Sequence, residues 1–140
     1  MASFSTVRTA LAARLATISS LHAYDTIPGT VEVPAAIVTI PPGQFVTYDT
    51  AMARSADDLT FSILLLVSPA DDAIAQDALD AYLAGTGTSS IKTAIEGDPD
   101  LGNTADYVAV GGAADYGLHE VAGISYWGCR FSVAVGVTGA

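Results

Sequence analysis

The C-terminal part of the chain carries the pattern that most restricts how it can fold. Apolar side chains or a thiol occupy every second position over eleven residues: Trp127, Cys129, Phe131, Val133, Val135 and Val137. Because successive side chains of a β-strand point to opposite faces, these six lie on one face of a strand. The pattern therefore predicts a long final strand with one face in the core. We expect it to pair with the preceding strand through a turn near 121–124.

A second segment, Leu59–Val67, predicts a strand that runs into the middle of a sheet. It begins with alternating apolar and polar residues and ends in five consecutive apolar ones, so it enters half exposed and ends buried. Shorter strands are expected at Leu21–Asp25, Ala35–Ile40 and Tyr107–Val110. Prolines on both sides of Ala35–Ile40 indicate that one end of that strand lies at a sheet edge. The pair Gly111–Gly112 is expected to interrupt the Tyr107 strand as a turn or bulge.

Three segments have the spacing and end signals of helices. The first is predicted over Thr6–Ser19, where apolar residues recur at steps of four and three: Val7, Leu11, Leu15 and Ile18. The second has Ser68 as its N-cap, Pro69 at its first position and Gly85 as its stop. Its predicted apolar stripe comprises Ile74, Ala75, Ala78, Leu79, Tyr82 and Leu83. A short third helix is predicted after the hydroxyl residues at 88–90, over Ile91–Glu96.

This order of elements is typical of the α+β class. One helix, three strands, two helices and three more strands predict an antiparallel-rich mixed β-sheet, with the two main helices packed on one face. At 140 residues the chain has the length of one domain, and residues 1–140 are expected to form it.

The composition excludes several classes of function. Hydrophobic residues make up 51% of the chain, which excludes a mainly disordered state. Fifteen acidic residues against five basic ones give a formal charge of −10, so a basic stripe along a nucleic-acid backbone cannot be built. Adhesion to an anionic membrane is disfavoured for the same reason, and the longest apolar run is too short to cross a bilayer. Because the N-terminus does not read as a signal peptide, we expect a soluble protein made in a cytoplasm.

The residues that could carry catalysis or bind a metal do not form a known pattern. The glycines and hydroxyl residues of 85–90 lack the lysine spacing of a phosphate loop. The acidic segment 98–106 lacks the ligand spacing of an EF-hand. The histidines His22 and His119 have no nucleophile motif beside them, and Cys129 alternates with core residues. We therefore expect no enzyme activity, no catalytic residues, no metal and no cofactor.

The segment Tyr48–Asp58 is the strongest candidate for a contact surface. It is polar, lies between two predicted strands, and carries an aromatic residue, Met52 and Arg54 in a chain with few cations. Loops of this kind between rigid strands often make contacts, and Met and Arg are enriched at interfaces. An ordinary exposed loop is the alternative interpretation.

Several pieces of the chain resemble tail terminator (neck) proteins of long-tailed bacteriophages, particularly the small ones from phages of actinobacteria. They cover most of the chain. The similarity lies in the order of the elements and in short stretches of sequence rather than in one strict motif. The pieces are the helix Leu11–Ile18, the segment Tyr48–Arg54 leading into the Phe61 strand, the helix Ala75–Leu83, the run Ser90–Gly102 and a C-terminal β-hairpin.

The resemblance implies a structural virion protein of the tail or neck, assembled in the host cytoplasm. Such a protein forms a ring, expected to be a hexamer, that caps the tail tube, stops its polymerisation and joins it to the head-side connector. DNA passes through the lumen without sequence-specific binding. The resemblance further implies that four residues make inter-subunit or tube contacts: Tyr48, Met52, Arg54 and Asp57. A head-to-tail connector or stopper protein, and a non-viral cytoplasmic α+β domain that binds a small molecule, remain as alternatives.

The contact interpretation of Arg54 can be tested directly. Arg54→Ala is expected to weaken ring or tube association and to leave the melting temperature of the monomer nearly unchanged. Sedimentation and thermal unfolding of the two proteins measure these effects. A large loss of monomer stability would show instead that Arg54 is a structural residue.

Overall fold

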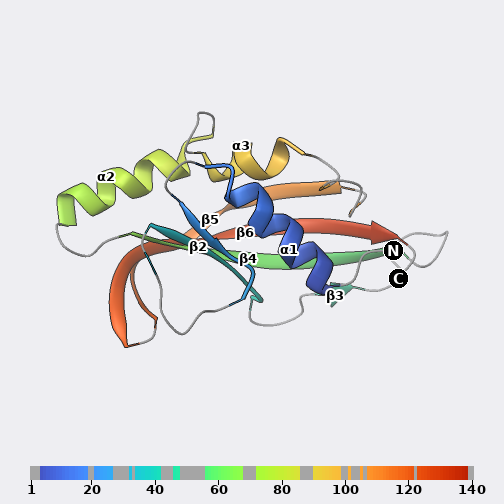
Figure 1. Cartoon of the computed structure of the whole chain (residues 1–140), viewed down its shortest axis with the longest axis horizontal. Helices are drawn as coiled ribbons and strands as arrows, with labels where there is room; N and C mark the ends of the chain where they lie inside the picture. The colour runs from blue at the N-terminus through green and yellow to red at the C-terminus, as the bar shows by residue number, and fades with distance from the viewer. Residues whose placement is uncertain are drawn as a thin grey trace.

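The computed structural model describes residues 4–18, 21–26, 32, 34–41, 46–47, 56–67, 72–85, 90–98, 101, 105, 107–121 and 123–138. Along the chain it contains α1 (Phe4–Leu15), β1 (His22–Tyr24), β2 (Ala35–Thr39), β3 (Val46–Thr47), β4 (Ala56–Val67), α2 (Asp72–Leu83), α3 (Ile91–Glu96), β5 (Tyr107–Val121) and β6 (Ile124–Thr138) (Figure 1).

The strands form one mixed sheet in the order β1-β2-β4-β6-β5, and the two-residue β3 also pairs with β4. Only β1 and β2 run parallel; the other pairs are antiparallel. The predicted α+β class and antiparallel-rich sheet are therefore confirmed. The strand β4 pairs with β6 along all twelve of its residues, and every side chain from Phe61 to Val67 is buried. This confirms the prediction that the apolar end of β4 lies in the middle of the sheet.

One face of the sheet carries all three helices. The apolar side chains of α1, α2 and α3 share one core with alternate residues of β4 and β6. The face predicted for the final strand is confirmed, because Cys129, Phe131, Val133, Val135 and Val137 belong to this core and Trp127 packs against it. In the described part of the chain, the sheet thus has one face that the helices cover and one that they leave uncovered, here called the helix-covered and the helix-free face. The candidate site lies on the helix-free face.

Two helix predictions need correction. The first helix ends at Leu15 rather than at Ser19, because its hydrogen bonds tighten into turns that bond Thr17 N to Arg14 O and Ile18 N to Leu15 O. Ile74 was expected on the apolar stripe of α2, but its side chain is 68% exposed. The inward side of α2 is set by Leu79 and Tyr82, and Ile74 lies about 140° around the helix from Leu79 at 100° per residue. The predicted cap at Ser68 and Pro69 lies outside the described residues.

The region after the helices forms two long strands instead of three. Gly111–Gly112 marks a β-bulge, as one of the two predicted alternatives had it, because the register shifts between Val110 and Gly112 while the strand continues. A bulge inserts extra residues without ending the ladder, so the segments expected as separate strands join into β5. The turn predicted near 121–124 is confirmed by the pairing of Val121 with Ile124.

A second irregularity bends the hairpin formed by β5 and β6. The register shifts again between Ala114 and Gly117, and Asp115 there has a left-handed backbone, with φ of 56°. Gly117 pairs with Gly128. A Cβ atom added at Gly128 would stand 2.2 Å from the backbone oxygen of Leu65. Beyond this point the hairpin curves away from the direction of the other strands (Figure 1). The close approach of β6 to β4 therefore requires glycine at position 128.

Gly128→Ala is expected to destabilise the protein by about 1–3 kcal/mol, because the added methyl group forces backbone atoms apart. Urea unfolding followed by circular dichroism measures the change. The control is Gly85→Ala, whose new methyl group would have no atom within 4 Å. Equal stability of the two variants would contradict the close approach at Gly128.

Candidate functional site

Most residues that the sequence analysis placed in a contact surface lie outside the described part of the chain. This applies to Tyr48, Met52 and Arg54. The fourth, Asp57, is the second residue of β4, pairs with Val137 and is only 6% exposed. The residue is therefore largely shielded from solvent within the single chain. The contact role of all four residues stays a prediction.

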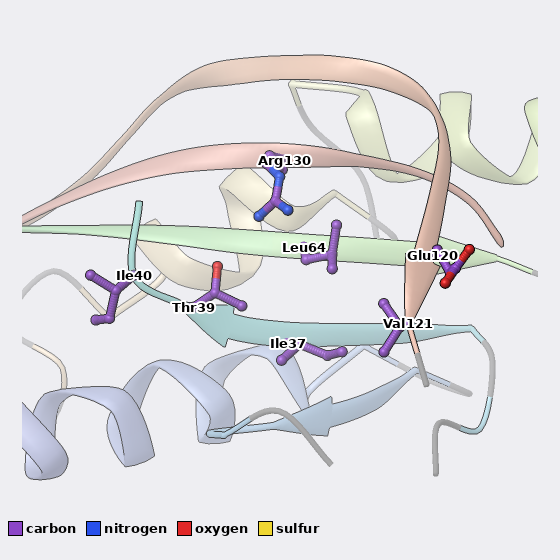
Figure 2. A pocket seen from close by; sticks show the side chains of 7 residues that line it. All are labelled: Ile37, Thr39, Ile40, Leu64, Glu120, Val121 and Arg130. Carbon is purple, nitrogen blue, oxygen red and sulfur yellow. The ribbon is translucent and has the colours of Figure 1, made fainter. Parts of the chain in front are cut away.

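The described structure instead has a groove on the helix-free face, with a volume of about 380 Å³. Four strands contribute its walls: β2 and β4 from the sheet, and the two strands of the curved hairpin, β5 and β6, above them (Figure 2). Its lining consists of Ile37, Thr39, Ile40, Leu64, Glu120, Val121 and Arg130.

The floor of the groove is apolar because β2 and β4 are buried on both faces. Alternate side chains of these strands point away from the helices and, together with Tyr126 of β6, form a second, smaller core: Ala35, Ile37, Leu64, Leu66 and Tyr126. Val121, at the end of the hairpin, packs against this cluster. The bend of the hairpin thus brings apolar cover to one part of the helix-free face, and the groove lies beside that cover.

Arg130 is the cation of the groove. It projects from β6 beside Leu64, and its guanidinium points into the groove (Figure 2). Its side chain is 38% exposed, and the nearest carboxylate oxygen, on Asp115, is 3.9 Å from its Nε. An ion pair that long and that exposed contributes little stability, so the guanidinium remains able to bind another anion.

The other polar side chains of the groove do not converge on a single point. The hydroxyl of Thr39 already donates a hydrogen bond to the carbonyl oxygen of Ser62, at 2.7 Å. Figure 2 shows Glu120 at one end of the groove, on the hairpin, and Ile40 near the other end. The arrangement suits contact with an apolar group that has a negative charge beside it.

A second hollow of about 320 Å³ adjoins the groove at the end of β2. It shares Thr39 and Ile40 with the groove and is also lined by Arg8 of α1. Within the described residues the ladder between β1 and β2 ends at Ile37, so the last part of β2 extends beyond its parallel partner. This agrees with the prediction that one end of this strand lies at a sheet edge. Ile40 therefore lines both hollows, the groove together with Arg130 and the second hollow together with Arg8.

The far end of the hairpin exposes large apolar side chains. Leu118 is 63% exposed and Ile124 is 52% exposed. Tyr116 also lies at the surface, with its ring 6.4 Å from that of Trp127 and its hydroxyl 3.4 Å from the Asp80 carboxylate of α2. Leu118 and Ile124 lie on opposite faces of the hairpin, because Leu118 pairs with Trp127 and Ile124 with Val121, so this end of the molecule exposes apolar side chains on both faces.

The titratable groups considered for catalysis are engaged elsewhere. Cys129 is buried in the main core, and burial raises the pKa of its thiol to about 12. His22 lies 3.7 Å from Glu32 on the far side of β1, and a ring nitrogen of His119 lies 2.7 Å from the backbone oxygen of Asp115. In the described ranges, no three His, Cys, Asp or Glu side chains come together as a metal-ligand set.

None of the described helices has the length and apolar composition needed to cross a membrane.

The chain matches no protein-family model and no curated protein sequence.

Sequence reasoning missed the groove, although one signal for it was present. The Ala35–Ile40 segment is apolar at nearly every position, and so is the end of β4. Strands of that kind need cover on both faces, and the predicted helices cover only one. This pattern therefore predicts a second apolar cluster on the other face. It does not predict that the end of the hairpin is the element that covers this cluster.

The thiol of Cys129 is expected to resist alkylation in the native protein at about pH 8. With the pKa raised to about 12, only ~1 thiol in 10,000 is ionised there, and burial blocks access to it. Mass spectrometry after iodoacetamide treatment measures the modification, and protein unfolded in urea gives the fully reactive reference. Rapid modification in native buffer would contradict the buried position.

Proposed function

We propose that this chain is a structural virion subunit that forms a ring at the end of a phage tail tube. The ring stops polymerisation of the tube and joins it to the head-side connector, and DNA passes through its lumen. The proposal begins from the resemblance to tail terminator proteins, and two features of the described surface support it.

The first feature, and the one that carries the proposal, is the exposed apolar end of the β5–β6 hairpin. Leu118 and Ile124 are each more than half exposed, and Tyr116 is 44% exposed. Leu118 pairs with Trp127 and Ile124 pairs with Val121, so Leu118 and Ile124 lie on opposite faces of the hairpin end and expose apolar surface on both of them. Single exposed apolar residues are common, whereas several on one projecting element indicate a surface that another protein covers. A subunit with neighbours on several sides has this property.

The second feature is the charge. Six copies with a formal charge of −10 each would carry −60. A ring this acidic repels the phosphates of DNA, so DNA would move through its lumen without adhering to the wall.

One alternative is favoured by a specific observation. The groove of about 380 Å³ has an apolar floor and one arginine, which is the size and chemistry of a site for a small amphipathic anion. A cytoplasmic domain that binds such a molecule is therefore the second candidate function. The spread of its polar groups makes it the weaker one.

Electron microscopy of the purified protein, alone and mixed with the tail tube protein of the same phage, tests the proposal. We expect rings, or caps at the ends of shortened tubes. The double variant Leu118→Asp, Ile124→Asp should lose these assemblies and keep its circular dichroism spectrum, because both side chains are exposed. The control Ala13→Asp, on the exposed side of α1, should assemble normally.

Two results would count against the proposal. Protein that stays monomeric and leaves tubes unchanged would favour the small-molecule domain. Rings that bind the head-side connector and ignore the tube protein would identify a connector or stopper instead.

A further inference from the structure

The groove and the exposed side of α2 are complementary surfaces on opposite faces of the same subunit. The groove offers an apolar floor made by Ile37, Leu64 and Val121, with the guanidinium of Arg130 pointing into it and the carboxylate of Glu120 at its hairpin end (Figure 2). A segment that fills it needs a large apolar side chain and a carboxylate a short distance away.

Helix α2 presents that combination. Ile74, Asp77 and Ala81 are all exposed, and their spacing of three and four residues places them on one stripe of the helix. The large apolar side chain is Ile74, at 68% exposure, and the carboxylate is one turn away on Asp77. Ala81 keeps the rest of the stripe low, so that the helix can approach another surface closely.

The charges of the chain favour a second copy as the occupant of the groove. Four cations lie in the described residues, and two of them have partners within the subunit: Arg14 donates to the backbone oxygen of Ala94, and Lys92 pairs with Glu96. Arg130 has only a distant, exposed partner in Asp115. In a chain with three times as many acidic as basic residues, a copy of the chain itself is a source of carboxylates for it.

A subunit cannot fill its own groove with its own α2. This helix packs through Leu79 and Tyr82 into the core on the helix-covered face, whereas the groove opens on the helix-free face. The two surfaces can therefore meet only between different copies, with each copy offering α2 on one side and the groove on the other.

We propose that the groove of one copy receives the exposed stripe of α2 from the next copy. In this contact Ile74 packs on Ile37, Leu64 and Val121, and Asp77 binds Arg130. The contact is head-to-tail, so it generates a ring when the rotation between copies closes. The inference rests on the proposed function, because it names the contact that would build the ring.

Single substitutions test both sides of the contact. Arg130→Glu and Ile74→Glu are each expected to raise the dissociation constant of self-association at least about 30-fold, which corresponds to ~2 kcal/mol. Both side chains lie at the surface, so the melting temperature should stay near that of the wild type. Matched controls are Lys92→Glu on α3 and Ala13→Glu on α1, which should associate like the wild type. Analytical ultracentrifugation over a concentration series measures the dissociation constants.

Mixing the two variants tests the head-to-tail geometry. Arg130→Glu keeps a normal α2, and Ile74→Glu keeps a normal groove, so an equal mixture can form one intact contact per pair. We expect each variant alone to be monomeric and the mixture to give a two-subunit complex. The double variant Arg130→Glu, Asp77→Arg reverses both charges of the pair and should recover much of the lost association.

The outcomes separate this inference from the proposed function. Wild-type rings that survive both single substitutions would overturn the contact and leave the ring function in place. Wild-type protein that stays monomeric, yet caps tail tubes, would also overturn the contact alone. Tube capping lost only in Arg130→Glu would assign the groove to the tube protein. Absence of both rings and caps would overturn the proposed function as well.

Discussion

The burial of β4 on both faces is the constraint on which the rest of the structure depends. Every side chain from Phe61 to Val67 is shielded from solvent, so apolar cover is needed above and below the strand. The three helices supply it for Ile63 and Leu65. For Leu64 and Leu66 the cover comes from Tyr126 and Val121, at the far end of the hairpin. The hairpin therefore has to reach back over the helix-free face.

The hairpin can cover the helix-free face only if it bends, and the groove forms beside the bent end. The left-handed residue Asp115 and the close approach at Gly128 let the two long strands curve together without breaking their ladder. The curved end covers one part of the second core and stops there. Beside it the floor made by Ile37 and Leu64 lines a groove, with Arg130 carried on the strand above. The groove thus results from the way the central strand is buried.

The sequence predicted the layers of the fold better than the candidate site, for a physical reason. Alternation over Trp127–Val137 depends only on neighbours along the chain, and the strand face it predicted is confirmed. The exposure of Ile74 depends on which side of α2 meets the sheet. The predicted apolar stripe was wide enough to include Ile74, whereas, among the described residues, only a narrower part of it, around Leu79 and Tyr82, is buried. The groove depends on a bulge that bends the hairpin and on a contact between Val121 and residues more than fifty positions earlier in the chain. No local pattern reports such a contact.

Charge also decides which kind of contact between copies is favourable. A two-fold contact through α2 would set Asp77 and Asp80 against the same carboxylates of the partner copy, and like charges across an interface repel. A two-fold contact through the groove would oppose one Arg130 with another. A contact between the groove and α2 brings opposite charges together, and such a head-to-tail contact repeats in one direction, closing into a ring or extending as a filament according to the rotation between copies. In an acidic chain with few cations, an arginine on the helix-free face and an acidic helix on the other therefore favour a head-to-tail contact, the kind that the proposed ring requires, over a two-fold dimer.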